Sequence, residues 1–321
     1  MKKKLIVMLL AFVMVFAFTA CGGGSDSGSS DGDDAVKVAM ITDYGDITDQ
    51  SFNQTTYEAC KAFCEANELD FTYKKPASDA DADRISSIEE AIEEGYNTIV
   101  MPGYAAVKMG FTKLGFLGGM AVPAVQRYGH GFVQGADAAA SEAGISDVEI
   151  KYVYGGQFFG DADITAAMDT WYGKGTEVVF ACGGGIYTSA AEAAAKVGGK
   201  VIGVDVDQAG IIDGAYGEGM TVTSAMKGLA PTVDTLLGAI LAGDWEAYKG
   251  QIQTLGLISE VPSDNFVQLP DSTQWGDGFT KDDYATLVGE LYAGTRTVSD
   301  STDAIPETTA VKVDDQGAIK G

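Results

Sequence analysis

The sequence contains a single histidine, His130, among its 321 residues. Histidine is the usual general base of catalytic triads and a common zinc ligand. One copy all but excludes a histidine-centred triad and a metal site with several histidines. No cofactor or metal is therefore expected from this residue type.

Basic residues are also scarce, with 21 lysines and arginines against 46 aspartates and glutamates and a formal net charge of −25. Binding of nucleic acid needs a basic face, so the composition argues against a nucleic-acid partner. A strongly negative protein also repels free nucleotides and phosphates, although salt weakens this repulsion beyond roughly 8 Å. A neutral ligand is easier to accommodate.

Cysteine is rare as well, with four copies in the chain. Cys60 and Cys64 are four residues apart on a predicted helix, so they share one helix face. A metal site would need further ligands nearby, and the sequence offers none. We expect these two cysteines, like Cys182, to behave as small buried apolar side chains.

The first residues have the pattern of an export signal. Three lysines precede a long apolar run, which predicts a signal peptide over residues 1–20 and is somewhat short for a membrane span. The run ends in Phe-Thr-Ala-Cys, which resembles a bacterial lipobox with Phe18 where leucine is usual, so lipidation of Cys21 is expected. Residues 21–35 are rich in Gly, Ser and Asp and predict a flexible tether spanning roughly 20 Å.

From residue 36 onward, short apolar runs alternate with longer amphipathic ones. This alternation predicts an α/β fold with parallel sheets and helices on both faces. The expected strands are 36–42, 69–75, 97–103, 113–119, 148–155, 177–185, 200–208, 220–228 and 311–315. The expected helices are 51–67, 81–95, 123–144 with an interruption, 162–175, 186–199 and 229–243.

Two such sheets in one exported chain suggest two lobes with a cleft between them. Ligands of these sheets bind beyond the carboxyl ends of the strands. Asp43 ends the first strand, and Phe52 and Asn53 begin the next helix after a cap at Ser51 or Asp49, so these residues should face the cleft. A carboxylate there can accept hydrogen bonds from ligand hydroxyls, and a ring offers a stacking face.

Simpler roles remain open for the same residues. Asp43 could cap the following turn, Phe52 could belong to the core, and Lys227 could be a surface charge. Asp205 and Asp207 could form an acid/base pair, but neither a histidine nor a third acidic ligand is near.

The glycines at 183–185 sit between a strand and a helix, as phosphate-binding loops do. They match neither the dinucleotide-binding pattern nor the P-loop pattern, and no lysine follows. A phosphate-binding role is therefore disfavoured.

Five stretches, in their order and spacing, carry a resemblance to a known family. They are residues 42–54, 115–136, 183–185 after EVVFAC, 201–208 and 223–228. Together they resemble the basic membrane lipoprotein family, whose best-described members are purine nucleoside receptors. The resemblance implies a periplasmic-binding-protein type I fold with two Rossmann-like lobes and a hinge.

The same resemblance implies a function without enzymatic activity. It describes a lipid-anchored substrate-binding protein on the extracytoplasmic face of the cell membrane. Such a protein would act as a monomer, bind a nucleoside in the cleft, and deliver it to the permease and ATPase subunits of an ABC transporter.

Seven ligand-binding residues follow from the resemblance by position. It places the ribose against two acids and a lysine, and the base between two aromatic rings. The residues are Asp43, Asp205 and Lys227 for the ribose, Phe52 and Phe158 for the base, and Asn53 and Gly184 for a hydrogen bond and a close backbone approach.

One departure from the family lies at Gly103. There the family continues through a helix, a strand and an acid-bearing loop, whereas here Tyr104 follows directly. We infer an internal deletion of one or two thirty-residue βα units, which shortens the first lobe. The expected division is an N-terminal lobe at 36–122, a C-terminal lobe at 123–225, and hinge-crossing segments with the tail at 226–321.

Three other functions stay open beside the nucleoside receptor. The ligand could be a sugar or another small polar molecule, because sugars also stack on aromatic rings. A shortened lobe could leave a relic that binds nothing. A nucleoside-processing enzyme is disfavoured because no carboxylate-rich cluster surrounds Asp43.

Overall fold

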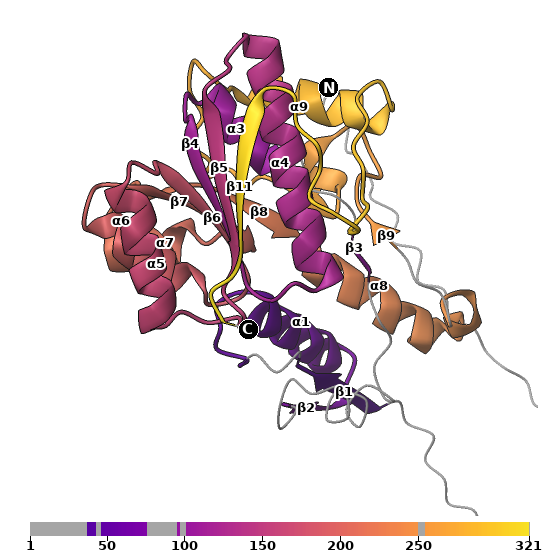
Figure 1. The fold of residues 1–321 in the computed structure, drawn as a ribbon. Coiled ribbons are helices and arrows are strands. Elements are labelled where there is room, and N and C mark those ends of the chain that lie inside the picture. Colours follow the sequence, from indigo (N-terminus) through magenta and orange to yellow (C-terminus); the bar gives the residue numbers. More distant parts are fainter. Residues whose placement is uncertain (1–36, 43–45, 76–94, 97–100, 250–253, 321) are drawn as a thin grey trace, which may run out of the picture. The chain divides into compact units, whose positions relative to one another are not determined.

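The computed structural model describes residues 37–42, 46–75, 95–96, 101–249 and 254–320, in which helices and strands alternate (Figure 1). The strands are β1 (Lys37–Ile41), β2 (Asp70–Lys74), β3 (Gly95–Tyr96), β4 (Lys113–Gly118), β5 (Val148–Tyr154), β6 (Val178–Cys182), β7 (Lys200–Asp205), β8 (Thr221–Lys227), β9 (Thr254–Leu255), β10 (Val267–Gln268) and β11 (Val311–Ala318). The helices are α1 (Phe52–Ala66), α3 (Met101–Lys108), α4 (Pro123–Ala143), α5 (Ala162–Gly173), α6 (Tyr187–Ala195), α7 (Ala209–Tyr216), α8 (Leu229–Ala242) and α9 (Lys281–Tyr292), with short 3-10 turns at Trp245–Ala247 and Pro262–Asp264.

A seven-stranded sheet organises the residues from 113 onward. Its order is β10-β8-β7-β6-β4-β5-β11, and every pairing is parallel except that of β10 with β8. This sheet confirms the predicted α/β class with parallel strands. It includes β4, which comes from the segment 36–122 that we assigned to the first lobe.

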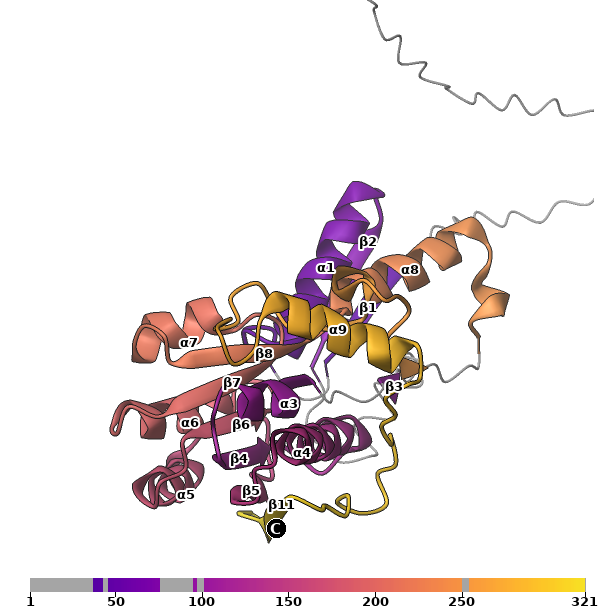
Figure 2. The same cartoon turned by 90° about the horizontal axis from the view of Figure 1, so that it is seen from above.

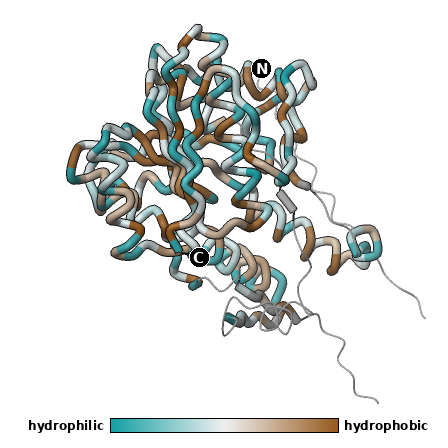
Figure 3. The backbone as a smooth tube through the Cα atoms, in the orientation of Figure 1, coloured by the Kyte–Doolittle hydropathy of each residue, from teal (hydrophilic) through white to brown (hydrophobic). Residues whose placement is uncertain are grey.

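Both faces of this sheet are buried, as parallel sheets require. Along β6, Phe180 packs into a cluster with α3 and α4, whereas Val179 and Ala181 pack into a cluster with α5, α6 and α7. Alternate side chains of the strand thus pack into two separate hydrophobic cores. The helices lie on both sides of the sheet (Figure 2). Hydrophobic residues gather along these inner strands (Figure 3).

The expected strand at 97–103 is wrong where the structure describes it. Residues 97–100 lie outside the described part, and Met101 to Lys108 form helix α3. A continuous apolar run does not distinguish a buried strand from a buried helix, and Pro102 suits a first helical turn. Gly103 lets α3 approach α4 closely, because a Cβ there would lie 2.0 Å from the backbone oxygen of Phe132.

The interruption expected in the long helix is also wrong, because α4 runs unbroken from Pro123 to Ala143. Its glycines serve close packing: a Cβ on Gly129 would lie 2.2 Å from the hydroxyl of Tyr152. His130 lies in this helix, 2% exposed, with Nδ1 2.9 Å from the backbone oxygen of Ser301. The single histidine therefore has a structural role.

The chain before residue 101 contributes two small sheets in its described part. β1 pairs with β2, and β3 pairs with the distant β9, each in parallel. Helix α1 connects β1 to β2 and contacts α8. The helix expected at 81–95 falls on residues 81–94, outside the described part, and Gly95 begins β3.

Two further expectations about packing are confirmed. Cys60, Cys64 and Cys182 are all buried, as expected. The expected strand at 311–315 returns as β11, which pairs with β5 at the sheet edge.

Candidate functional site

The segment from Asp49 to Asn53 enters helix α1, and its backbone is fixed by the Asp49 carboxylate. That carboxylate accepts hydrogen bonds from the backbone N–H of Ser51, Asn53 and Gln54, at 2.9, 3.1 and 3.0 Å. It also accepts one from Asn53 Nδ2 at 3.0 Å. Burial raises the pKa of Asp49, although these hydrogen bonds oppose the shift. Of the two expected caps, Asp49 supplies the side-chain bonds.

Asp205 ends strand β7 in a buried and strained position. Its backbone φ is +69°, which is uncommon for a residue with a side chain, and it is 3% exposed. Ser51 Oγ donates to Asp205 Oδ2 at 2.6 Å, and Lys227 Nζ lies 2.9 Å from Asp205 Oδ1. Such strain persists where surrounding contacts over-determine the conformation, and it clusters at functional sites.

Lys227, at the end of β8, lies between this acid and two aromatic rings. Its side chain is 10% exposed. Nζ lies 5.2 Å from the ring centroid of Phe52 and 4.8 Å from that of Tyr128. The predicted Phe52, Asp205 and Lys227 therefore come together although they are far apart in sequence, and Lys227 is not a surface charge.

The glycine-rich loop after β6 packs directly on Phe158. Gly184 has φ +49°, and a Cβ there would lie 2.9 Å from the backbone oxygen of Phe158 and 3.8 Å from Asp49 Oδ2. Gly185 N donates to that same Phe158 oxygen at 2.8 Å. A Cβ on Gly119 would lie 2.4 Å from the Phe158 ring. A side chain at Gly119 would therefore displace the ring.

A pocket of about 430 Å³ opens beside these residues. Its lining residues are Asp46, Thr48, Asp49, Lys75, Met120, Gly156, Gln157, Phe158, Phe159 and Gly185. The volume lies within the range of about 300–1,000 Å³ that is usual for small-molecule sites. Phe159 is 54% exposed at its edge, while Phe158 is half-buried.

The structure places the predicted residues unevenly around this pocket. Phe158 lines it, and Gly184 and Asn53 touch its lining residue Asp49. Phe52, Asp205 and Lys227 form the neighbouring cluster, which Ser51 connects to the Asp49 segment. Asp43 and Cys21 lie outside the described residues.

Four participants were missed by sequence reasoning. They are the Ser51 hydroxyl as a partner of Asp205, the Tyr128 ring beside Lys227, Phe159 at the pocket, and Gln208. Gln208 is fully buried, and its Oε1 accepts from Val204 N at 2.9 Å. The sequence signal that could have identified Gln208 is its position directly after Asp207, at the end of a predicted strand.

These groups can exchange hydrogen bonds with a small polar molecule, and their rings can stack on a flat part of it. Asp207 does not pair with Asp205, because its Oδ1 accepts from Ala209 N and from Ser272 Oγ, at 3.1 and 2.7 Å. Within the residues described, no group of three His, Cys, Asp or Glu side chains could hold a metal ion. The described helices also include none with the length and apolarity needed to cross a membrane.

A sequence profile for the family described as Bmp, ABC transporter substrate-binding protein PnrA-like, matches this chain over residues 36–108 and 101–261. The two matches together span most of the chain. They overlap at residues 101–108.

Curated relatives are 27–28% identical to this chain over the aligned segments. A CD4+ T-cell-stimulating antigen of Listeria innocua is 27% identical over 318 residues, covering 76% of this chain and 86% of the relative. The ABC transporter nucleoside-binding protein BmpA of Lactococcus lactis is 27% identical over 270 residues, covering 65% and 75%. Basic membrane protein B of Borreliella burgdorferi is 28% identical over 181 residues, covering 54% and 48%.

Solved structures of solute-binding proteins share the fold. An ABC transporter solute-binding protein from Conexibacter woesei superposes with a TM-score of 0.56 at 19% identity, covering 83% of this chain and 99% of that one. Another from Aeropyrum pernix gives a TM-score of 0.58 at 17% identity, covering 79% and 85%. These neighbours have the periplasmic-binding-protein type I fold that the family resemblance implied.

Proposed function

Because the chain belongs to the Bmp family of PnrA-like ABC transporter substrate-binding proteins, we propose that its ligand is a nucleoside, purine nucleosides first. Proteins of this family are extracytoplasmic binding subunits of transporters and not enzymes. The finer claims proposed here concern the ligand, the residues that hold it and the lipid anchor.

The observation that carries the proposal is the buried cluster of Asp205, Lys227, Ser51 and Phe52. A buried carboxylate is tolerated when it is paired, and here a lysine and a hydroxyl supply the pairing. The two ribose hydroxyls of a nucleoside are donors of the same kind. We propose that they bind Asp205, with Asp43 as the second acid and Lys227 as a supporting donor.

The base would occupy the aromatic part of the same region. Phe158 and Phe159 line the pocket of about 430 Å³, and Phe52 lies at the Asp205 cluster. Stacking of a base on an aromatic ring contributes roughly 1–3 kcal/mol. Asn53 would hydrogen-bond the ligand, and Gly184 would let the backbone approach it.

Two observations favour a nucleoside over a sugar. One relative is named as a nucleoside-binding protein. The pocket also presents two neighbouring phenylalanines, which give more flat apolar surface than a single sugar ring needs. A sugar remains the alternative outcome of the experiment below.

We propose in addition that Cys21 carries the lipid and that residues 21–35 tether the binding domain, a monomer, to the extracytoplasmic face of the membrane. The support is the lipobox-like sequence and the role of this family as substrate-binding proteins of membrane transporters. The permease and ATPase subunits of that transporter are the expected protein partners.

The internal deletion after Gly103 is also retained as a proposal. The chain matches the family profile in two separate stretches that meet at residues 101–108, as expected if two distant parts have been joined there. The alignment with the Listeria innocua relative is 318 positions long but includes only 76% of the 321 residues of this chain. Many residues of the relative therefore have no counterpart in this chain. The first lobe would then lack a βα unit or two.

A thermal melt of the chain without its signal peptide tests the ligand, using inosine, guanosine, adenosine, uridine and ribose. A ligand that binds the native state must raise Tm. Asp205→Asn should abolish the rise, whereas Asp147→Asn, at an exposed position, should preserve it.

The outcomes separate the competing functions. A rise with purine nucleosides supports the proposal, and a rise with ribose alone selects the sugar alternative. A cooperative melt that no ligand moves removes the nucleoside function. Absence of a cooperative melt identifies a truncated relic.

A further inference from the structure

The loop Gly155–Asp161 connects β5 to α5 and forms one wall of the pocket. Phe158 and Phe159 project from its middle. On one side the loop is fixed by the glycine-rich loop, through Gly185 N to Phe158 O and a bridge between Phe159 and Gly185. Neither contact holds Gln157 or the Phe159 carbonyl on the opposite side.

The segment that follows β11 lies on that opposite side. β11 runs parallel to β5, and Ile319 N donates to Tyr154 O at 2.8 Å, immediately before the loop. Lys320 then passes over Gly156, where a Cβ would lie 2.8 Å from the Lys320 backbone oxygen. Gly156 also has φ +81°, so this crossing depends on a glycine.

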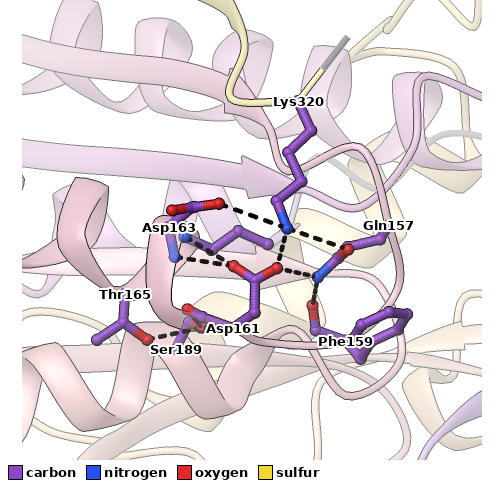
Figure 4. Close-up of polar contacts among 8 residues, drawn as sticks. Gln157, Phe159, Asp161, Asp163, Thr165, Ser189 and Lys320 are labelled. Atoms are coloured by element: carbon purple, nitrogen blue, oxygen red, sulfur yellow. Dashed lines mark hydrogen bonds and ion pairs between the residues drawn. The ribbon is translucent and has the colours of Figure 1, made fainter.

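The Lys320 side chain ends among the polar groups of the loop (Figure 4). Its ammonium forms an ion pair with Asp161 Oδ2, lies 3.5 Å from Gln157 Oε1, and lies 3.8 Å from Asp163 Oδ2. Gln157 Nε2 donates in turn to Asp161 Oδ2 at 2.8 Å and to the Phe159 carbonyl at 3.0 Å. Lys320 is thus joined to the Phe159 backbone through Gln157.

The two carboxylate oxygens of Asp161 accept hydrogen bonds from different partners. Oδ1 caps helix α5 by accepting from Asp163 N and Ile164 N, each at 3.0 Å. Oδ2 accepts from Lys320 and Gln157. The Asp161 backbone is anchored separately, since its N–H donates to Ser189 Oγ at 3.0 Å. Loss of Lys320 therefore leaves the helix cap and this anchor in place.

We propose that Lys320 is a positioning residue that clamps the loop Gly155–Asp161 and so fixes the two phenylalanines of the pocket wall. Its effect on a nucleoside rests on the function proposed above, but its effect on the loop does not. A charge-assisted contact to Asp161 and Gln157 restrains Phe159 from the side that the glycine-rich loop leaves open.

The clamp is tested first without ligand, by amide hydrogen exchange of the chain with Lys320→Met. Exchange at residues 157–160 should become about three- to tenfold faster, as expected for losing a half-buried ion pair and one charge-assisted hydrogen bond. Lys320→Arg should restore the slow exchange. Lys312→Met, at an exposed lysine on the preceding strand β11, is the matched control and should change nothing.

Gln157→Ala is the second variant, because it breaks the link to Phe159 and leaves the ion pair. It should reproduce the faster exchange at 158–160, and combination with Lys320→Met should add little to it. Unchanged exchange in both variants would overturn the clamp. So would faster exchange spread over α5, because this would mean that Lys320 merely stabilises the helix.

Ligand dissociation is then measured on the same variants. If the wild type binds inosine, Lys320→Met should speed dissociation about as much as it speeds exchange, and Lys320→Arg should reverse the change. Faster exchange with unchanged dissociation would overturn the link to the ligand. If the wild type binds no nucleoside, the proposed function fails, and the exchange data alone decide whether Lys320 clamps the loop.

Discussion

The two regions that build the candidate site differ in how they are supported. Asp205 and Lys227 end strands of a seven-stranded sheet with both faces buried, and Gly184 and Phe158 lie in loops that follow strands of that sheet. Segment 49–53 leads into helix α1, which follows β1, and in the described part of the chain β1 pairs with β2 alone. Isolated two-stranded sheets are marginally stable, so within the described residues the site joins a strongly supported half to a less supported one.

This difference predicts which property, stability or ligand binding, a substitution in each region should change. A change in the seven-stranded sheet should lower the stability of the whole protein. A change near α1 should affect ligand binding more than overall stability.

The largest expected effect is in the sheet core. Phe180 is fully buried, with its ring centroid 5.4 Å from that of Phe132, so Phe180→Ala should cost about 3–5 kcal/mol of unfolding free energy. Phe71 in β2 is half-buried beside Tyr57, and Phe71→Ala should cost about 1 kcal/mol. Urea midpoints measure both, and equal losses would contradict the comparison.

The next effect concerns the Lys227–Asp205 pair. Lys227→Met leaves a buried carboxylate without its cation, which should cost about 3 kcal/mol and prevent nucleoside binding. The matched control is Lys196→Met, because Lys196 pairs with Asp169 on the exposed surface, where loss of an ion pair should hardly change stability. Adding Asp205→Asn to Lys227→Met should recover part of the stability, and a further large loss would refute this account.

Substitutions of two hydroxyl side chains, Thr280 and Ser51, should separate an effect on stability from an effect on ligand binding. Thr280 caps α9 in a reciprocal capping box, so Thr280→Ala should cost about 1 kcal/mol of stability and leave ligand affinity unchanged. Ser51 makes no cap bond but donates to Asp205. Ser51→Ala should weaken nucleoside binding about fivefold through loss of that hydrogen bond. Calorimetry and melts of the two variants should give opposite patterns.

The smallest effect is a pH dependence at the Lys320 clamp. The Lys320 ammonium and the cap bonds lower the pKa of Asp161 to about 2. A lowered folded-state pKa gives stability that is present above the unfolded value near 4 and lost as pH falls toward 2. From pH 6 to pH 3, wild type should therefore lose up to about 1 kcal/mol more than Lys320→Met. Parallel losses in urea melts would disprove the coupling.

The sequence supported the fold well because most strands are short apolar runs followed by amphipathic helices. It failed at α3, where Met101 to Val107 are buried on all sides and show no period that separates helix from strand. It failed again at α4, where Gly129 and its neighbours signalled a break but serve close contact with β5.

The site was predictable in its parts and not in its connections. Residue types at strand ends, with the family resemblance, pointed to Asp205 and Lys227, which the structure brings into contact. The bonds from Ser51 to Asp205 and from Lys320 to Asp161 span 154 and 159 positions. No local pattern encodes pairings at that separation, because they depend on which strands become neighbours.

The buried state of the cysteines has a practical consequence for optical measurement. Cys60, Cys64 and Cys182 are all buried, and burial raises the pKa of the Cys64 and Cys182 thiols, which suppresses the reactive thiolate. A cysteine introduced beside the exposed Phe159 would then be the preferred target for a maleimide dye once Cys21 is removed. A dye attached to this single cysteine would make the protein a fluorescent sensor of its ligand.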